Sequence, residues 1–341
     1  MATTVDENSI NELKDGEPII RFEHVQQSFN DNVVIPDLNL TINAGELFVL
    51  VGTSGSGKTT TLKMVNQLQP QSGGKIFIKD ENITDIGLQE LRWNIGYVLQ
   101  QIALFPTMTV AQNIAVIPEM KGVKREEIDA TIDRLLNQVG LDPEKYRNRM
   151  PSELSGGEQQ RIGICRAIAS EPPVVLMDEP FSALDPISRT QLQDLVLDLH
   201  AKRHDTIIFV THDMDEALKL GDRIAVMSEG KILQVDTPTN IAQHPANQFV
   251  EAFFSQSVAH NVYDVYVGKM VMMGFSESVL PEGHTAPIDI SSDKTLGEAF
   301  DDLTNCEYLR VMDGDRQLGF IDAQNIVNYL SQRKRDEDEN N

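Results

Sequence analysis

Cysteine and long apolar runs are both scarce in this 341-residue chain. There are only two cysteines, Cys165 and Cys306. Two cysteines cannot form the multi-bridge framework of a small secreted domain, so we expect a reducing compartment. No stretch approaches the roughly 18 consecutive apolar residues of a membrane-spanning helix. The first eleven residues are polar and acidic and lack the apolar core of a secretory signal peptide, so an intracellular protein is expected.

Basic residues are also few. The chain has 29 Lys and Arg against 52 Asp and Glu, which gives a formal net charge of −23. Such a balance disfavours a nucleic-acid partner, because binding to phosphate backbones depends on basic surfaces. The hydrophobic fraction of 40% is still sufficient for ordinary cores. The length predicts roughly two domains.

Three short apolar runs indicate buried strands, namely Leu47–Val51, Val174–Met177 and Ile207–Val210. Their apolarity is continuous rather than alternating, which is typical of a parallel sheet covered by helices on both faces. Helical spacing of apolar residues occurs between the runs, for example in Glu126–Val139. Strands that alternate with helices predict an α/β fold.

The pattern changes near residue 255. We expect a flexible N-terminal tail over residues 1–18 and one long α/β domain over residues 19–256. A smaller domain is expected over residues 257–331, followed by a charged C-terminal tail over residues 332–341.

A phosphate-binding loop follows the first apolar run. The segment fits G-x-x-x-x-G-K-[ST] and precedes a helical stretch, which is the context that the motif requires. Glycines let the backbone wrap around phosphate, and the helix N-terminus adds its dipole. Lys58 is predicted to neutralise the β- and γ-phosphates and Thr59 to bind Mg²⁺. The alternative is a flexible Gly/Ser loop with no ligand, but this does not explain why the strand, the motif spacing and the helix occur together. The residues expected to hold nucleotide here are Gly52, Thr53, Ser54, Gly55, Ser56, Gly57, Lys58, Thr59 and Thr60.

A second acidic motif ends the run Val174–Met177. Asp178 and Glu179 follow that strand directly, at the carboxyl edge where ligands of parallel sheets bind. We expect Asp178 to hold Mg²⁺ through water and Glu179 to accept a proton from an attacking water. Acidic residues often merely end strands, but the phosphate loop makes the metal-site interpretation the stronger one.

The segment Leu154–Arg161 (LSGGEQQR) resembles the signature sequence of ATP-binding cassette (ABC) ATPases. The resemblance covers roughly residues 19–255 and implies a P-loop NTPase fold with a RecA-like core and a helical subdomain. It also implies that Gln100 senses Mg²⁺ and the attacking water, and that His212 contacts the γ-phosphate. Phe29 stands where the family has an aromatic residue that stacks on adenine.

The resemblance further implies a dimer that shares its sites. In this family, ATP lies between the phosphate loop of one subunit and the signature sequence of the other. Ser155, Gly156 and Gly157, with Asp185 of the D-loop segment Ser182–Asp185, are therefore expected to serve nucleotide in such a dimer. A second copy of the chain is the simplest partner.

Several segments are similar to the ATPases of osmoprotectant importers for glycine betaine, carnitine or choline. They include Lys63–Asn66 (KMVN) and Thr211–Ala217 (THDMDEA). The similarity implies separate transmembrane permease subunits, an indirect link to a substrate-binding protein, and a peripheral place at the cytoplasmic face of the cell membrane. An importer ATPase for a polyamine, amino acid or sugar, and a non-transport ABC ATPase, remain alternatives.

The C-terminal part resembles a single cystathionine-β-synthase (CBS) module. A helix is expected over residues 294–303 and another over 323–330, with strands over 308–312 and 317–321. Asp322 and Asn325 replace the usual Thr and Asp of the nucleotide-contacting corner. Regulation by a ligand or by salt, and simple docking, both remain open for this part of the chain.

Overall fold

The computed structural model describes residues 15–30, 32–182, 184–261, 265–281, 287–304, 306–314 and 316–339. The chain divides into two compact units, Met1–Glu251 and Ala252–Asn341. The division falls five residues before the expected boundary, inside helix α10 (Gln248–Asn261). Of the expected N-terminal tail, residues 1–14 lie outside the described residues, and strand β1 already begins at Pro18.

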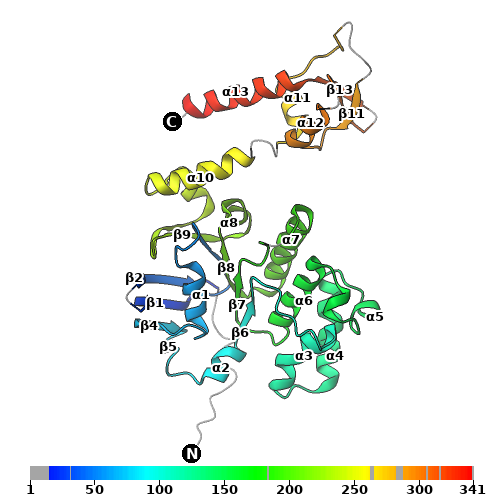
Figure 1. The fold of residues 1–341 in the computed structure, drawn as a ribbon. Helices are drawn as coiled ribbons and strands as arrows, with labels where there is room; N and C mark the ends of the chain where they lie inside the picture. The colour runs from blue at the N-terminus through cyan, green and yellow to red at the C-terminus, as the bar shows by residue number, and fades with distance from the viewer. Residues whose placement is uncertain are drawn as a thin grey trace, which may run out of the picture. The chain divides into compact units, whose positions relative to one another are not determined.

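A six-stranded sheet forms the centre of the first unit (Figure 1). Its order is β10-β9-β3-β8-β7-β6, and all neighbouring pairs are parallel except β10 with β9. The three predicted apolar runs become adjacent central strands that are buried along their whole length. The α/β expectation is therefore confirmed. The strands are β3 (Leu47–Val51), β6 (Ile95–Val98), β7 (Val174–Asp178), β8 (Thr206–Thr211), β9 (Arg223–Ser228) and β10 (Lys231–Asp236).

A second, antiparallel sheet in this unit was not anticipated from the sequence. Its order is β2-β1-β4-β5, from β1 (Pro18–Phe29), β2 (Asn32–Asn43), β4 (Gly73–Ile78) and β5 (Glu81–Asn82). Register shifts interrupt the pairing of β1 with β2 at several places, and each shift breaks the alternation of buried and exposed residues. The sequence of this sheet therefore carries no clean period of two.

One apolar core joins the two sheets through helix α1 (Lys58–Val65). Leu62, Met64 and Val65 of α1 are fully buried in a cluster that also contains Phe22 of β1 and Leu176 of β7. Helix α1 contacts β7 and β8, so its N-terminus is fixed at their carboxyl ends. The other helices of this part are α2 (Leu88–Trp93), α7 (Pro186–Arg203), α8 (Met214–Leu220) and α9 (Pro238–Gln243).

A helical region lies beside strand β6 (Figure 1). Helix α6 contacts β6, α3, α4 and α7. Buried Asn113 fixes the loop that leads into α3, because its side-chain amide donates to the carbonyls of Phe105, Met108 and Thr109. The elements are α3 (Val110–Met120), α4 (Arg125–Gln138), α5 (Pro143–Tyr146), a 3₁₀ turn (Pro151–Glu153) and α6 (Gly156–Ile168).

The second unit contains a three-stranded sheet of order β11-β12-β13. The expected helix–strand–strand–helix order is present and is preceded by strand β11, and Thr295 caps α12 through a capping box. Helix α13 continues to Glu339, so the charged residues expected as a tail from 332 are helical as far as the structure describes them. The elements are α11 (Val267–Met272), β11 (Ile288–Ser291), α12 (Leu296–Asp302), β12 (Leu309–Asp313), β13 (Arg316–Ile321) and α13 (Ala323–Glu339).

Residues 265–281 also contribute to this second unit. Val267 and Met270 of α11 are fully buried in its core together with Leu296 and Val311. Glu277 pairs with Phe320 as an isolated bridge. The core of the second unit therefore includes residues that precede the helices and strands expected from the sequence. Among the described residues of the whole chain, no helix is long and apolar enough to cross a membrane.

Candidate functional site

The predicted phosphate loop lies between β3 and α1. Its backbone turns through left-handed conformations at Gly55 and Gly57, with φ of 79° and 103°. A side chain at Gly52 would place its Cβ 2.0 Å from the carbonyl oxygen of Met227, so only glycine fits there. Gly57 precedes α1, which has no side-chain cap and no acidic residue in its first turn. The helix N-terminus is thus left with its positive dipole facing the pocket.

Lys58 is the buried cation of this loop. Its side chain is only 4% exposed, and its Nζ donates to the carbonyls of Gly52 at 2.7 Å and Thr53 at 2.9 Å. Burial lowers the pKa of Lys58, and the nearby carboxylates of Glu179 and Asp178 partly oppose this. Because the buried ammonium contacts only two neutral carbonyls, it can bind an anion that enters the pocket.

Asp178 ends strand β7 and faces the phosphate loop. Its Oδ1 accepts a hydrogen bond of 2.7 Å from the Thr59 hydroxyl, and its Oδ2 accepts one of 3.3 Å from the Tyr97 hydroxyl. The side chains predicted to hold a metal, Thr59 and Asp178, therefore lie in contact. Hydroxyl and carboxylate oxygens are the ligand types that Mg²⁺ prefers.

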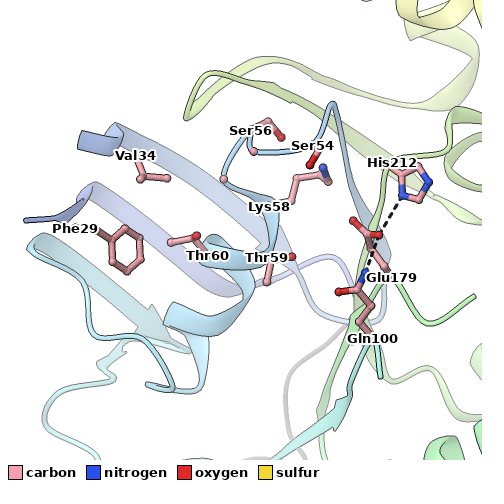
Figure 2. A pocket seen from close by; sticks show the side chains of 12 residues that line it. Phe29, Val34, Ser54, Ser56, Lys58, Thr59, Thr60, Gln100, Glu179 and His212 are labelled. Carbon is pink, nitrogen blue, oxygen red and sulfur yellow. Dashed lines mark hydrogen bonds and ion pairs between the residues drawn. The ribbon is translucent and has the colours of Figure 1, made fainter. Parts of the chain in front are cut away.

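Glu179 lies beside Asp178 and contacts both other predicted catalytic side chains (Figure 2). Its Oε2 accepts a hydrogen bond of 3.3 Å from Gln100 Nε2 and lies 3.1 Å from Nδ1 of His212. Since an ionised carboxylate can only accept, Nδ1 of His212 carries the proton in this contact. Three residues from different loops are thus joined around one carboxylate oxygen.

The backbone of Glu179 is held as firmly as its side chain. It adopts a φ of 42°, in the left-handed region that non-glycine residues rarely use. Its N–H donates to the carbonyl of Val210 at 3.0 Å, and its carbonyl accepts from the Ser182 hydroxyl at 3.1 Å. A strained conformation fixed by neighbours is typical of catalytic positions.

The phosphate loop, Gln100, Glu179 and His212 line a cavity of about 620 Å³. Phe29 lies at one end and is 42% exposed, while Gln100, Glu179 and His212 lie at the other (Figure 2). The exposed ring at one end suits a base, and the phosphate loop with its buried ammonium suits a polyphosphate. The cavity is lined by Phe29, Val34, Ser54, Gly55, Ser56, Gly57, Lys58, Thr59, Thr60, Gln100, Glu179 and His212.

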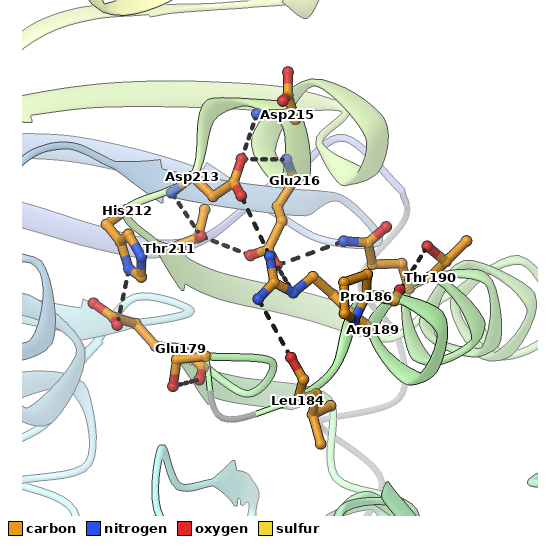
Figure 3. Close-up of polar contacts among 12 residues, drawn as sticks. Glu179, Leu184, Pro186, Arg189, Thr190, Thr211, His212, Asp213, Asp215 and Glu216 are labelled. Atoms are coloured by element: carbon orange, nitrogen blue, oxygen red, sulfur yellow. Dashed lines mark hydrogen bonds and ion pairs between the residues drawn. The ribbon is translucent and has the colours of Figure 1, made fainter. Parts of the chain in front are cut away.

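A polar network joins helix α7 to the segment that carries His212 (Figure 3). Arg189 of α7 donates to the carbonyl of Leu184 at 3.4 Å and lies 3.9 Å from the carboxylates of Asp213 and Glu216. Burial raises the pKa of Glu216, whose Oε2 accepts a hydrogen bond of 2.7 Å from Thr211. The network ties the segment before Asp185 to the loop of His212.

The signature residues are not brought into this cavity. Ser155 and Gly157 line a separate cavity of about 300 Å³ beside helix α6. Ser155 caps α6 in a capping box, in which Glu158 N donates to its hydroxyl and its own N–H donates to Glu158 Oε2. Gly156 begins the helix, as the motif predicts.

Asp185 also caps a helix in this chain. Its carboxylate accepts from the N–H of Ser188 at 3.0 Å at the start of α7, and these hydrogen bonds with Ser188 lower its pKa. Ala183 of the expected D-loop lies outside the described residues. Within one chain, Asp185 therefore has a structural partner and does not line the cavity of Lys58.

Sequence reasoning missed two residues of the site. Val34 lines the cavity near Phe29, and no motif marks it. Tyr97 bonds to Asp178, and its only signal is its place three residues before Gln100. Position in the sheet, rather than spacing in the sequence, brings Tyr97 to the carboxylate that is predicted to hold a metal.

Comparison with known proteins agrees with this geometry. Residues 35–182 match the family model described as ABC transporter. The chain is 43% identical over 314 residues to the choline transport ATP-binding protein OpuBA of Bacillus subtilis, covering 90% of this chain and 79% of the relative. It is 48% identical over 234 residues to the osmoprotectant import ATP-binding protein OsmV of Salmonella typhimurium, covering 69% and 61%.

Solved structures give the same result. The chain resembles cbiO1 from Clostridium perfringens, part of the ABC transporter complex cbiONQ, with a TM-score of 0.63 and 26% identity over 73% of this chain and 95% of that one. It resembles the dimeric bacterial ABC transporter cassette MJ0796 with a TM-score of 0.59 and 30% identity over 64% and 99%. With its phosphate loop, acidic strand end, glutamine and histidine gathered around one cavity, this chain belongs to the ATP-binding subunits of the ABC transporter family.

Proposed function

We propose that this chain is the ATP-hydrolysing subunit of an importer for quaternary-amine osmoprotectants such as glycine betaine, carnitine or choline. The extent of its likeness to OpuBA supports this most directly. A match over 90% of the chain cannot be confined to the first unit, so it includes much of the second.

The cavity residues fit ATP and Mg²⁺. Lys58 lacks an anionic partner at hydrogen-bond distance among the described residues, and a Cβ at Gly55 would meet no protein atom within 4 Å, so the loop is open at that position. Thr59, Asp178 and Gln100 would hold Mg²⁺, which would draw charge from the bound phosphates. Phe29 would stack on the base. Glu179 would accept the proton of the attacking water, with Gln100 and His212 holding its carboxylate in place.

A second copy of the chain is needed to complete each site. Ser155 and Gly157 lie outside the cavity of Lys58, so the signature sequence cannot serve the nucleotide of its own chain in this arrangement. The capping box of Ser155 and Glu158 fixes the first turn of α6, so the signature turn is ordered within one chain. A homodimer with two shared sites supplies both halves.

The membrane partner would bind at a groove between β6, α2, α3 and α6, named here the β6 groove. It has a volume of about 430 Å³, and Tyr97, Ala103, Phe105, Ile117 and Arg166 are among its lining residues. Phe105 is 45% exposed although it is a large apolar side chain. Transmembrane permease subunits would dock here at the cytoplasmic face of the membrane, and a substrate-binding protein would act through them only.

The second unit would act as a CBS-like regulatory or docking module. Residues 257–341 carry 16 acidic and 7 basic side chains, a higher density of net charge than the rest of the chain. Exposed charge of one sign responds to ionic strength through screening. A response to intracellular salt would suit an osmoprotectant importer.

Uptake of radiolabelled glycine betaine, carnitine and choline tests the proposal in cells with and without this chain, at low and high osmolarity. We expect uptake to depend on the chain, and a Lys58→Ala chain to behave as the deletion does. If deletion leaves osmolyte uptake unchanged but abolishes the uptake of a polyamine, amino acid or sugar, that compound is the transported solute instead. If deletion leaves the uptake of every tested solute unchanged, a non-transport ATPase is favoured.

A further inference from the structure

Tyr97 joins two features that the proposed function treats separately. Its hydroxyl donates to Oδ2 of Asp178 at 3.3 Å, while Thr59 occupies Oδ1 of the same carboxylate. Both oxygens of the metal-site aspartate are therefore oriented by hydroxyl groups. One of those hydroxyls belongs to the phosphate loop, and the other belongs to the strand β6.

The sheet register explains this contact. Tyr97 pairs with Leu176 in the parallel ladder of β6 and β7. Asp178 is two residues beyond Leu176, so its side chain lies on the same face of the sheet as that of Tyr97. The contact is built into the central sheet rather than into a mobile loop.

Tyr97 is one of the residues that line the β6 groove. It is only partly buried and packs against the apolar core of the first unit. The same residue therefore lines the groove and contacts a buried carboxylate through its hydroxyl. Asp178 itself is 3% exposed and has no surface of its own to sense the groove.

Other residues that line the groove are held by hydrogen bonds. Arg166 donates to the carbonyl of Ala103 at 2.6 Å, and its guanidinium lies 5.7 Å from the centre of the Phe105 ring. Asn113 both donates to the carbonyl of Phe105 and accepts from its N–H. A molecule that enters the groove therefore meets held residues at Phe105 and Arg166 as well as Tyr97.

The Tyr97 hydroxyl is the donor in its contact with Asp178, because an ionised carboxylate can only accept hydrogen bonds.

We propose that Tyr97 is a positioning residue that links occupancy of the β6 groove to Mg²⁺ binding at Asp178. The proposal rests on the proposed function, in which Asp178 serves Mg²⁺ and the groove receives a permease segment. Displacement of the ring by an occupant moves the hydroxyl relative to Oδ2 and changes the orientation of the carboxylate. Docking at the groove thereby reaches the metal site through one side chain.

The first experiment replaces Tyr97 with Phe in the full chain, which keeps the ring and removes the hydroxyl. Binding of a fluorescent ATP analogue is measured in EDTA and over a range of Mg²⁺ concentrations. We expect unchanged affinity in EDTA and an increase of about three- to tenfold in the Mg²⁺ concentration for half-saturation, the effect of one lost hydrogen bond to a carboxylate. Tyr266→Phe, which removes an exposed phenol in the second unit, is the matched control.

The second experiment fills the groove. A cysteine at Phe105 in a Cys306→Ser background is labelled with pyrene maleimide, since Cys165 is buried. The label should change the Mg²⁺ half-saturation at least threefold when residue 97 is Tyr, and have no further effect when it is Phe. A label at Met120, which is 56% exposed and does not line the groove, should have no effect in either chain.

The outcomes separate the two levels of the proposal. An unchanged Mg²⁺ half-saturation in Tyr97→Phe refutes the positioning role, and so does an equal loss of affinity in EDTA and in Mg²⁺. An equal effect of the groove label in both chains refutes the link. If the wild-type chain itself binds the analogue without any dependence on Mg²⁺, the proposed function of the site fails first.

Discussion

Glu179→Gln is the substitution that tests the catalytic assignment most directly. The change removes the negative charge and the ability to accept a proton, but it keeps the size of the side chain. The side chain of Glu179 is 18% exposed, and its Oε2 accepts from Gln100 and faces His212. A glutamine whose carbonyl oxygen points the same way can still accept both contacts.

The structure therefore predicts loss of turnover with little loss of binding. A positioned general base contributes about 10²- to 10⁴-fold to rate, which corresponds to about 3–5 kcal/mol in the activation barrier. Lys58, the phosphate loop and Phe29 are untouched, so the affinity for ATP should change by less than about threefold. In the proposed dimer, ATP that is bound and not hydrolysed should also keep the two copies associated.

Steady-state phosphate release, binding of a fluorescent ATP analogue and size-exclusion chromatography with ATP measure these three effects. Glu127→Gln is a matched control, because it removes the same charge from an exposed position in the first turn of α4. Its turnover should stay within about twofold of wild type. Wild-type turnover in Glu179→Gln would show that another group accepts the proton, and a loss of affinity equal to the loss of turnover would show that the residue acts in binding.

Three further predictions follow from the same geometry. Lys58→Ala should weaken binding of the ATP analogue by at least about tenfold, since it removes the buried cation of the loop, and unchanged affinity would contradict the phosphate-site assignment. Ser155→Arg chains mixed with Lys58→Ala chains should regain part of the hydrolysis that each lacks alone, since one site of the mixed dimer is intact; no recovery, with mixed dimers demonstrated, would refute sites shared between copies. His200 lies 3.4 Å from Asp222, and hydrogen bonding to that carboxylate raises the pKa of His200 above 6.5. The stabilising effect of the pair is therefore complete below pH 6.5 and is lost as the pH rises through the raised pKa. His200→Gln should therefore lower the stability to urea by up to about 1 kcal/mol at pH 6, and by less at pH 9, because Asp222 is more than half exposed; an equal loss at both pH values would refute the pairing.

The parallel sheet could be predicted from sequence because its strands are buried on both faces. The run Leu47–Val51 is apolar throughout and becomes β3 with the same bounds. The antiparallel sheet could not be predicted in this way. Strand β1 is twelve residues long but shifts register with β2 at several places, so its buried positions follow no single period. Local pattern predicts a strand only where the pairing is regular.

Contacts within the site were predictable only where a motif specifies them. The geometry of the phosphate loop is encoded locally, because the glycines and the following helix are adjacent in the sequence. The contact of Tyr97 with Asp178 depends on the alignment of β6 with β7, which lie about eighty residues apart along the chain. The separation of Ser155 from Lys58 likewise depends on how the helical region is placed.

Each half of the proposed shared site is rigid within one chain. The phosphate loop is held by the two bonds of Lys58, and the signature turn is held by its capping box. Glu158 strengthens that turn, since its carboxylate accepts from the N–H of Ser155 at 2.7 Å and from the Tyr146 hydroxyl at 2.6 Å. Control of hydrolysis in such a protein does not require either half to change shape. A change of about 1.4 kcal/mol in the association of two copies alters the fraction of complete sites up to tenfold, and a module on the same chain needs to supply no more than that.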